Sequence, residues 1–173
     1  MIARQALICA AAFVVLSAIP AIASALPAPR VTSVQSLDQL AVPDRPYDES
    51  ANADAAVDAA FARASAEHKL VLIDLGGNWC ADCRILAGVM DLPEVRSFID
   101  AHYVSVSVDV GRFNRNLQIP ARFGITSRLE AVPALLISTP EGKLLDREKV
   151  SALGDARSMS AQAMADWLAQ WVQ

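Results

Sequence analysis

Two cysteines separated by two residues, Cys80 and Cys83, are the side chains of this sequence best suited to chemistry. They follow the apolar run Leu70–Leu75, whose length and flanking charged and glycine residues predict a strand buried on both faces. A helix is expected to begin at Cys80, and the unpaired N–H groups and dipole at a helix N-terminus favour a thiolate. A thiolate attacks disulfides, and a second thiol one helical turn along can resolve the mixed disulfide that forms. The pattern therefore predicts thiol–disulfide exchange at this pair.

The periodicity of the chain predicts the elements that must hold this pair in place. Apolar stripes predict helices over Ala51–Glu67, Cys80–Asp91, Glu94–Ala101 and Ser158–Val172, and a helical turn over Pro120–Phe123. Apolar runs of strand length cover Leu70–Leu75, Tyr103–Val108, Ala134–Ser138 and Lys143–Arg147. A turn joins the last two runs, which predicts a hairpin. Helices that alternate with buried strands predict an α/β fold, with a mixed central sheet of about four strands flanked by helices.

The segment Asp74–Arg84 resembles the active-site segment of thioredoxins, in which an aspartate precedes a Trp-Cys pair by the same number of residues. A second point of resemblance is Val132-Pro133, which precedes an apolar strand. The resemblance covers roughly Ala51–Gln173 and implies a thioredoxin-like fold. In that family the corresponding proline follows a cis peptide bond and lies beside the two sulfurs. A cis X-Pro bond in a folded protein usually serves a fixed local purpose.

The resemblance implies a role for each residue of the redox centre. Cys80 would be the attacking thiolate and Cys83 the resolving thiol, while Asp74 would be a buried carboxylate that helps to remove the proton from Cys83. Burial raises the pKa of a carboxyl group toward the range useful for a general base. The alternative is that Asp74 ends its strand and is satisfied by local hydrogen bonds. Catalysis of this kind requires a sulfur that is not sealed from solvent, and Pro133 close to the pair.

Three further residues are implied to form the substrate-binding surface. Trp79 would cap and shield the two sulfurs, and Val132 would present its backbone to an extended substrate segment. Pro133 would shape the groove that receives this segment. Two alternatives stay open, because Trp79 would also suit simple packing and Pro133 would also suit an ordinary trans bond in a turn.

The sequence departs from thioredoxins at three places. Ser105 stands where a lysine often accompanies the buried aspartate. The carboxylate of Asp82, beside Cys80, is expected to disfavour the thiolate, which predicts a reducing rather than an oxidising protein. The connection from Asp109 to Pro133 is longer than in a minimal thioredoxin, and it either rims the site or is a solvated surface loop. It carries four arginines, Arg112, Arg115, Arg122 and Arg128.

The N-terminal residues predict export. Arg4 precedes an uncharged apolar stretch that ends in Ala23-Ser24-Ala25, the pattern of a secretory signal peptide with a small-x-small cleavage site. We therefore expect residues 1–25 to be a cleaved signal, residues 26–50 to be a flexible, proline-containing arm with a short strand near Val31–Val34, and residues 51–173 to form the thioredoxin-like domain. The alternative is an uncleaved membrane anchor. In both cases the folded part is periplasmic, and a cleaved chain would not insert stably into a membrane.

Composition argues against other classes of function. The chain has 19 acidic against 15 basic residues, which disfavours nucleic-acid binding. His68 and His102 are its two histidines and are expected to face solvent near helix ends. Four-ligand zinc sites need better spaced ligands than these, and no phosphate-binding glycine loop or metal-type carboxylate cluster is present in the sequence. No cofactor is predicted.

The favoured hypothesis is a thiol–disulfide oxidoreductase that acts on protein disulfides outside the cytoplasm through Cys80 and Cys83, in the reducing direction. Because export removes it from cytosolic reductants, a membrane electron donor is expected. One alternative is a copper-binding module, or metallochaperone, in which the two thiolates hold Cu(I). Another is a non-catalytic partner-binding domain in which the cysteines are incidental.

Overall fold

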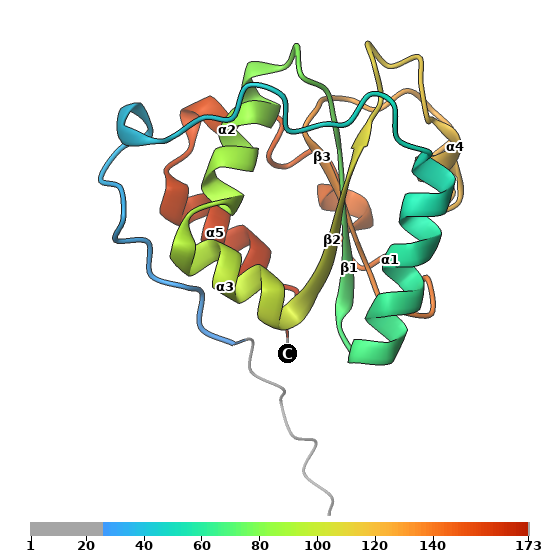
Figure 1. Ribbon diagram of the computed structural model, residues 1–173, viewed down its shortest axis with the longest axis horizontal. Coiled ribbons are helices and arrows are strands. Elements are labelled where there is room, and N and C mark those ends of the chain that lie inside the picture. Colours follow the sequence, from blue (N-terminus) through green and yellow to red (C-terminus); the bar gives the residue numbers. More distant parts are fainter. Residues whose placement is uncertain (1–25, 173) are drawn as a thin grey trace, which may run out of the picture.

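The computed structural model describes residues 26–172, and its centre is the strand β1, Leu70–Gly76. β1 pairs in parallel with β2, Tyr103–Asp109, and antiparallel with β3, Ala134–Ser138, so the sheet order is β2-β1-β3 (Figure 1). Every residue of β1 after Leu70 is buried, as the apolar run predicts for a strand covered on both faces. The predicted mixed sheet flanked by helices is confirmed.

Helices cover both faces of the sheet (Figure 1). One face packs against α1, Ala53–Glu67, through small or branched residues that let the helix approach closely, Val57, Ala60 and Ala64. The other face packs against α2, Ala81–Met90, together with α3, Pro93–His102, and α5, Ala161–Ala169. Short helical segments complete the chain: α4, Gln118–Ala121, and the 3-10 turns η1, Leu37–Gln39, η2, Arg147–Lys149, and η3, Ala156–Ser158.

The predicted fourth strand is the main difference at the sheet. Lys143–Arg147 does not form a strand, and its pairing with β3 is limited to one bridge, between Ser138 and Leu144. The carboxylate of Asp146 accepts the backbone N–H of Ile137 at 3.1 Å. A side chain thus occupies a donor on β3 that another strand would need, and the chain turns away into η2. The described part of the chain therefore contains three strands.

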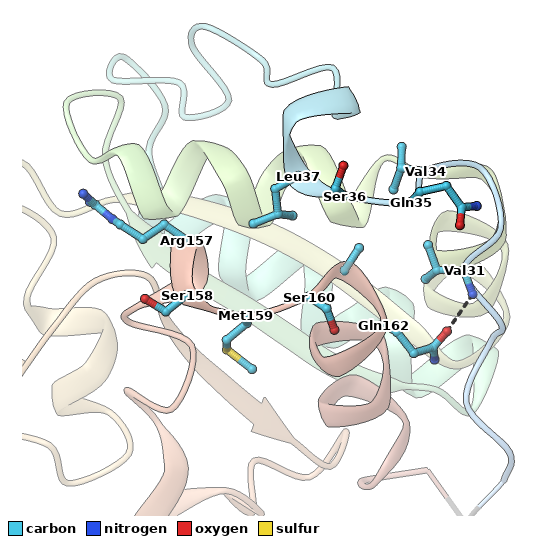
Figure 2. A pocket seen from close by; sticks show the side chains of 11 residues that line it. Val31, Val34, Gln35, Ser36, Leu37, Arg157, Ser158, Met159, Ser160 and Gln162 are labelled. Atoms are coloured by element: carbon cyan, nitrogen blue, oxygen red, sulfur yellow. Dashed lines mark hydrogen bonds between the residues drawn. The ribbon is translucent and has the colours of Figure 1, made fainter.

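Residues 26–50, predicted to be a flexible arm and here called the strap, lie along the domain and contact α3 and α5. The backbone N–H of Val31 donates to the Gln162 side chain at 2.8 Å (Figure 2), and Glu94 accepts from the backbone N–H groups of Thr32 and Ser33. The predicted strand near Val31–Val34 is absent, because these backbone groups bond to side chains of α3 and α5.

The strap then crosses the end of the sheet where α2 begins, before it enters α1 (Figure 1). Here Leu40 and Tyr47 are buried, at 8% and 2% exposure. Tyr47 packs into the core on the α1 side of the sheet, and Leu40 packs into the core on the α2 side. The predicted signal peptide over residues 1–25 lies outside the described residues. No helix within residues 26–172 combines the length and the apolar character needed to cross a bilayer.

Candidate active site

Cys80 and Cys83 lie at the N-terminus of α2, directly after the loop that follows β1. Cys80 is the N-cap residue, and its sulfur accepts a hydrogen bond from the backbone N–H of Cys83 at 3.1 Å. The two residues form a disulfide with Cα atoms 5.3 Å apart. Cys80 is 5% exposed whereas Cys83 has no exposed surface, so an incoming sulfur can reach only Cys80. Both cysteines are thus buried residues, and Cys80 retains the small exposed fraction of the pair.

The segment before β3 lies against the disulfide. The peptide bond between Val132 and Pro133 is cis, and the Val132 carbonyl oxygen is 3.4 Å from the Cys80 sulfur. This places Val132 and Pro133 beside the redox pair, so the alternative of a trans proline is wrong.

Asp74 is a buried carboxylate on the sheet face that α2 covers, with 3% exposure. Its Oδ2 accepts a hydrogen bond from the hydroxyl of Tyr47 at 2.8 Å, while its Oδ1 has no partner within the described residues. Burial raises the pKa of Asp74 from 3.8 to about 7, although the hydrogen bond from Tyr47 acts in the opposite direction. The alternative of local hydrogen bonding is wrong, because Tyr47 is 27 residues away. Such a carboxyl can take up or release a proton near neutral pH.

A pocket of 180 Å³ borders Asp74 on the side of β2. Its lining includes Ser105 and Ser107, so Ser105 leaves open space at the position where the resemblance places a lysine. The pocket has room for several water molecules. Asp74 is therefore flanked by a hydrogen-bonding side chain on one side and by a small polar pocket on the other.

Tyr47 is the residue of this centre that the sequence analysis missed. It belongs to the strap, and its backbone N–H and C=O both bond to the side chain of Asn78, at 3.0 and 2.9 Å. A β-carbon at Gly76 would lie 2.3 Å from the Tyr47 hydroxyl oxygen and 3.0 Å from the Cys83 sulfur, so only glycine leaves room for both. The available signal was a single aromatic residue in a proline-rich stretch, which does not point to a site.

Trp79 directly precedes Cys80 and is exposed, with 44% of its surface accessible. Its indole N–H donates to the carbonyl of Gly111 at 2.7 Å. The guanidinium of Arg112 lies over the ring, 4.8 Å from its centroid. The loop after β2 thus holds the tryptophan ring in place at the edge of the site.

Comparison with known proteins agrees with this geometry. The family model described as thioredoxin-like matches residues 52–140. The chain belongs to the thioredoxin-like family. It is 32% identical over 80 residues to a thioredoxin of Alicyclobacillus acidocaldarius subsp. acidocaldarius, covering 46% of this chain and 68% of that one. The crystal structure of a disulphide isomerase from Xylella fastidiosa Temecula1 is 35% identical with a TM-score of 0.67, covering 73% of this chain and 95% of that one.

The redox pair gives this thioredoxin-like protein its activity. Family membership, the two cysteines at the start of α2 and the cis-proline segment against Cys80 together identify a thiol–disulfide oxidoreductase. The disulfide recorded between Cys80 and Cys83 corresponds to the oxidised form of such a centre.

The charge of Asp82 is neutralised in this thioredoxin-like protein. The carboxylate accepts from the backbone N–H and the Nε of Arg157, both at 2.9 Å, and from Nη2 at 2.5 Å. This guanidinium lowers the pKa of Asp82. The expectation that Asp82 disfavours the Cys80 thiolate assumed an uncompensated charge, and this assumption is wrong. The compensating charge comes from Arg157, which is 75 residues away in the sequence.

The four arginines of the long connection divide into two groups. Arg115 pairs with the buried Asp109 at 2.9 Å, and Arg122 pairs with two carboxylates of α1. Arg112 and Arg128 form no ion pair with a carboxylate in residues 26–172, and Arg128 lies over the ring of Phe113, 4.5 Å from its centroid. The loop therefore brings two uncompensated positive charges to the rim of the thioredoxin-like site.

The two histidines lie away from the redox pair. His68 and His102 line one pocket together with Leu70, the first residue of β1. The sulfurs lie beyond the other end of that strand. His68 is exposed, as predicted, whereas His102 is half-buried and packs against Phe98. Within the described residues, no group of three or more His, Cys, Asp or Glu side chains is arranged to hold a metal ion.

Proposed function

We propose that this protein reduces disulfides of protein substrates outside the cytoplasm. The observation that supports the proposal is the position of Cys80, the one cysteine of the pair with any exposed surface, at a helix N-terminus and 3.4 Å from the Val132 carbonyl. Helix N–H groups stabilise the thiolate form of such a cysteine. The similar Xylella protein is described as a disulphide isomerase, and isomerisation begins with the same attack by a reduced cysteine.

Reduction takes two steps. The Cys80 thiolate attacks a substrate disulfide, so that a bond forms between the two sulfurs and the second substrate sulfur leaves as a thiolate. Cys83 then loses its proton toward Asp74 and attacks Cys80, which forms the Cys80–Cys83 disulfide and releases the first substrate sulfur as a thiolate. The substrate gains two electrons and the dithiol is oxidised. Asp74 acts as the general base for the second step.

The substrate segment is proposed to run beside Val132 and Pro133, with Trp79 as one wall. An adjacent groove of 310 Å³ is lined mostly by apolar side chains of the loop after β2, including Phe113 and Leu117. Leu117 is 39% exposed, so the groove offers apolar surface, and the ring of Phe113 lies against that of Trp79 with centroids 6.2 Å apart. An extended chain could form backbone hydrogen bonds at Val132 while an apolar side chain enters this groove.

The compartment and the electron donor are proposed from the first 25 residues, whose pattern is that of a signal peptide. Removal of this segment would leave residues 26–50 as the strap and residues 51–173 as the thioredoxin-like domain. Each turnover oxidises Cys80 and Cys83, so a dithiol donor, expected to be a membrane protein, must return two electrons.

Reduction of insulin by the chain without residues 1–25 tests the proposal. We expect turnover with a dithiol reductant, and no rate above background for Cys80→Ser, because the attacking sulfur is gone. Export is tested separately by the distribution of the full chain between periplasm and cytoplasm, compared with that of the chain without residues 1–25. Equal rates for the wild type and Cys80→Ser would remove the proposed function.

The unpaired arginines predict a preference for acidic substrates. We expect a disulfide peptide with flanking aspartates to have a kcat/KM roughly 3 to 10 times that of its lysine counterpart at low salt. The double variant Arg112→Ala/Arg128→Ala should remove this preference, since Arg112 lies over the Trp79 ring and Arg128 lines the groove. Arg63→Ala, on α1 and paired with Glu67, is the matched control and should keep it. A preference that survives in the double variant would contradict the prediction.

The copper alternative gains no support from the geometry of the site. A further ligand beside the two sulfurs would be needed, and both histidines lie at the start of β1, away from Cys80. A variant with both cysteines replaced by serine tests the remaining alternative, a partner-binding domain, because retained biological activity would favour it.

A further inference from the structure

Tyr47 lies between the buried carboxylate and the buried sulfur. Its hydroxyl donates to Asp74 Oδ2 at 2.8 Å. The hydroxyl oxygen and the Cys83 sulfur both lie within 3.0 Å of the point where a β-carbon on Gly76 would stand, so they are neighbours across this glycine. We propose that Tyr47 relays the proton of Cys83 to Asp74 when the mixed disulfide is resolved, a role that rests on the proposed function above.

The transfer is balanced within these three side chains. The hydroxyl oxygen of Tyr47 keeps lone pairs that can accept the S–H proton of Cys83 while its own proton moves to Asp74 Oδ2. Tyr47 is unchanged after the step, Asp74 becomes a neutral acid, and Cys83 becomes the thiolate that attacks Cys80. Burial raises the pKa of Tyr47, so the phenol keeps its proton between turnovers.

The strap is anchored where the relay needs it. Both backbone bonding groups of Tyr47 are held by Asn78, in the loop that leads to Cys80, and the Arg84 side chain donates to the Pro43 carbonyl at 3.0 Å. Tyr47 itself is 2% exposed. It also precedes residues 52–140, the part that matches the family model. The relay is therefore a contribution of this chain's own strap to the thioredoxin-like centre.

The pocket beside Asp74 gives the proton a way out. Asp74 lines this 180 Å³ pocket together with Ser105 and Ser107. Water in this pocket could remove the proton from Asp74 after each turnover.

Other titratable groups also face the pair. Charged groups near Asp74 and Tyr47 include Asp91, the C-cap of α2, Arg96 of α3 and Asp109 of β2. Asp109 is paired with Arg115 and Asp91 is paired with Arg96, so neither carboxylate is an unpaired competitor for the proton of Cys83. β3 supplies no charged residue, since its sequence is Ala-Leu-Leu-Ile-Ser.

The test is the pH profile of the resolving step in Tyr47→Phe, followed by acid quench and mass spectrometry of the mixed disulfide. At pH 6.5 to 7 we expect resolution to slow by about 10-fold or more and the mixed disulfide to accumulate. The defect should shrink as the pH rises toward the ordinary pKa of a thiol, because hydroxide then removes the proton directly.

In an Asp74→Asn background, Tyr47→Phe should slow resolution by less than a further factor of about two, because both residues serve one proton transfer.

Tyr103→Phe is the matched control. Tyr103 is the other tyrosine of the chain, is equally buried, and donates its hydroxyl to the Leu168 carbonyl at 2.6 Å, away from the sulfurs. It should keep the wild-type profile. Where Tyr47→Phe does not fold, Asn78→Ala replaces it, since it frees the backbone of Tyr47, and it should show a smaller defect with the same pH dependence.

The outcomes separate the relay from the function. A wild-type pH profile of resolution in Tyr47→Phe, or in Asn78→Ala where that variant is used, overturns the relay. The proposed function is still supported in that case if Cys80→Ser is inactive. The relay is also overturned if the rate of resolution in the double variant falls by the product of the two single effects, those of Tyr47→Phe and Asp74→Asn. An active Cys80→Ser removes the proposed function itself.

Discussion

Substitution of Cys83 by serine is expected to lower turnover roughly a thousandfold and to trap the substrate on Cys80. Cys83 has no exposed surface, so it cannot attack a protein substrate directly, and its role is limited to the bond with Cys80. Without it the mixed disulfide can be cleaved only by an external thiol, which is slow because Val132 and Trp79 flank the sulfur. Non-reducing electrophoresis and mass spectrometry would measure the trapped adduct.

Ala81→Ser is the control for this substitution. Ala81 is exposed at the first position of α2 and separates the two cysteines, so a serine there adds the same hydroxyl group without removing a sulfur. We expect it to turn over at nearly the wild-type rate and to trap nothing. A stable adduct on Cys83 in Cys80→Ser would reverse the assigned roles of the two cysteines.

The local part of the redox centre could be predicted from sequence because its parts are close along the chain. A strand of seven residues, two glycines and a helix that begins after Cys80 follow one another, and each has a strong local signal. The cis bond before Pro133 was also predicted, through the resemblance of Val132-Pro133 to the thioredoxin family. The mixed sheet flanked by helices was predicted as well and is confirmed, although it has three strands in the described residues instead of about four.

Contacts between distant residues could not be predicted in this way. The sequence analysis treated Asp82 as an uncompensated charge, but Arg157 neutralises it across 75 positions. Tyr47 reaches Asp74 from a strap that its prolines had suggested was mobile. The fourth strand was lost for a similar reason, since the carboxylate of Asp146 takes a backbone donor on β3. In each case one polar side chain decides the outcome, and periodicity carries no information about its partner.

The reducing direction illustrates the consequence for function. The sequence argument for the reducing direction rested on the charge of Asp82. Arg157 compensates this charge, so the argument no longer applies to Cys80. What remains in favour of reduction is the order of events, because the accessible sulfur must be reduced before it can attack. The reduction potential of the Cys80–Cys83 pair, measured against glutathione, decides the direction on thermodynamic grounds.

Asp74→Asn is expected to stabilise the folded protein by about 2 to 4 kcal/mol at pH 8 and to have little effect on stability at pH 4. Burial raises the pKa of Asp74 from 3.8 to about 7, so the folded state binds this proton more tightly than the unfolded state. The contribution of Asp74 to the stability of the wild type should therefore be most favourable below pH 4, fall as the pH rises to 7, and change little above pH 7. Asparagine keeps the oxygen that accepts from Tyr47 but cannot ionise, so it avoids the cost of a buried charge.

Urea unfolding of the oxidised protein between pH 4 and pH 8 measures this difference. Asp146 contributes a decline of the same sign in both proteins, because burial raises its pKa to about 6, and it cancels in the comparison. Asp82→Asn is the matched control with the opposite sign, since Arg157 lowers the pKa of Asp82 and the substitution should destabilise the protein at pH 8. Equal stability of Asp74→Asn and the wild type at pH 8 would show that burial does not raise the pKa of Asp74. The same variant should resolve the mixed disulfide slowly, so greater stability and slower catalysis would come from one carboxyl group.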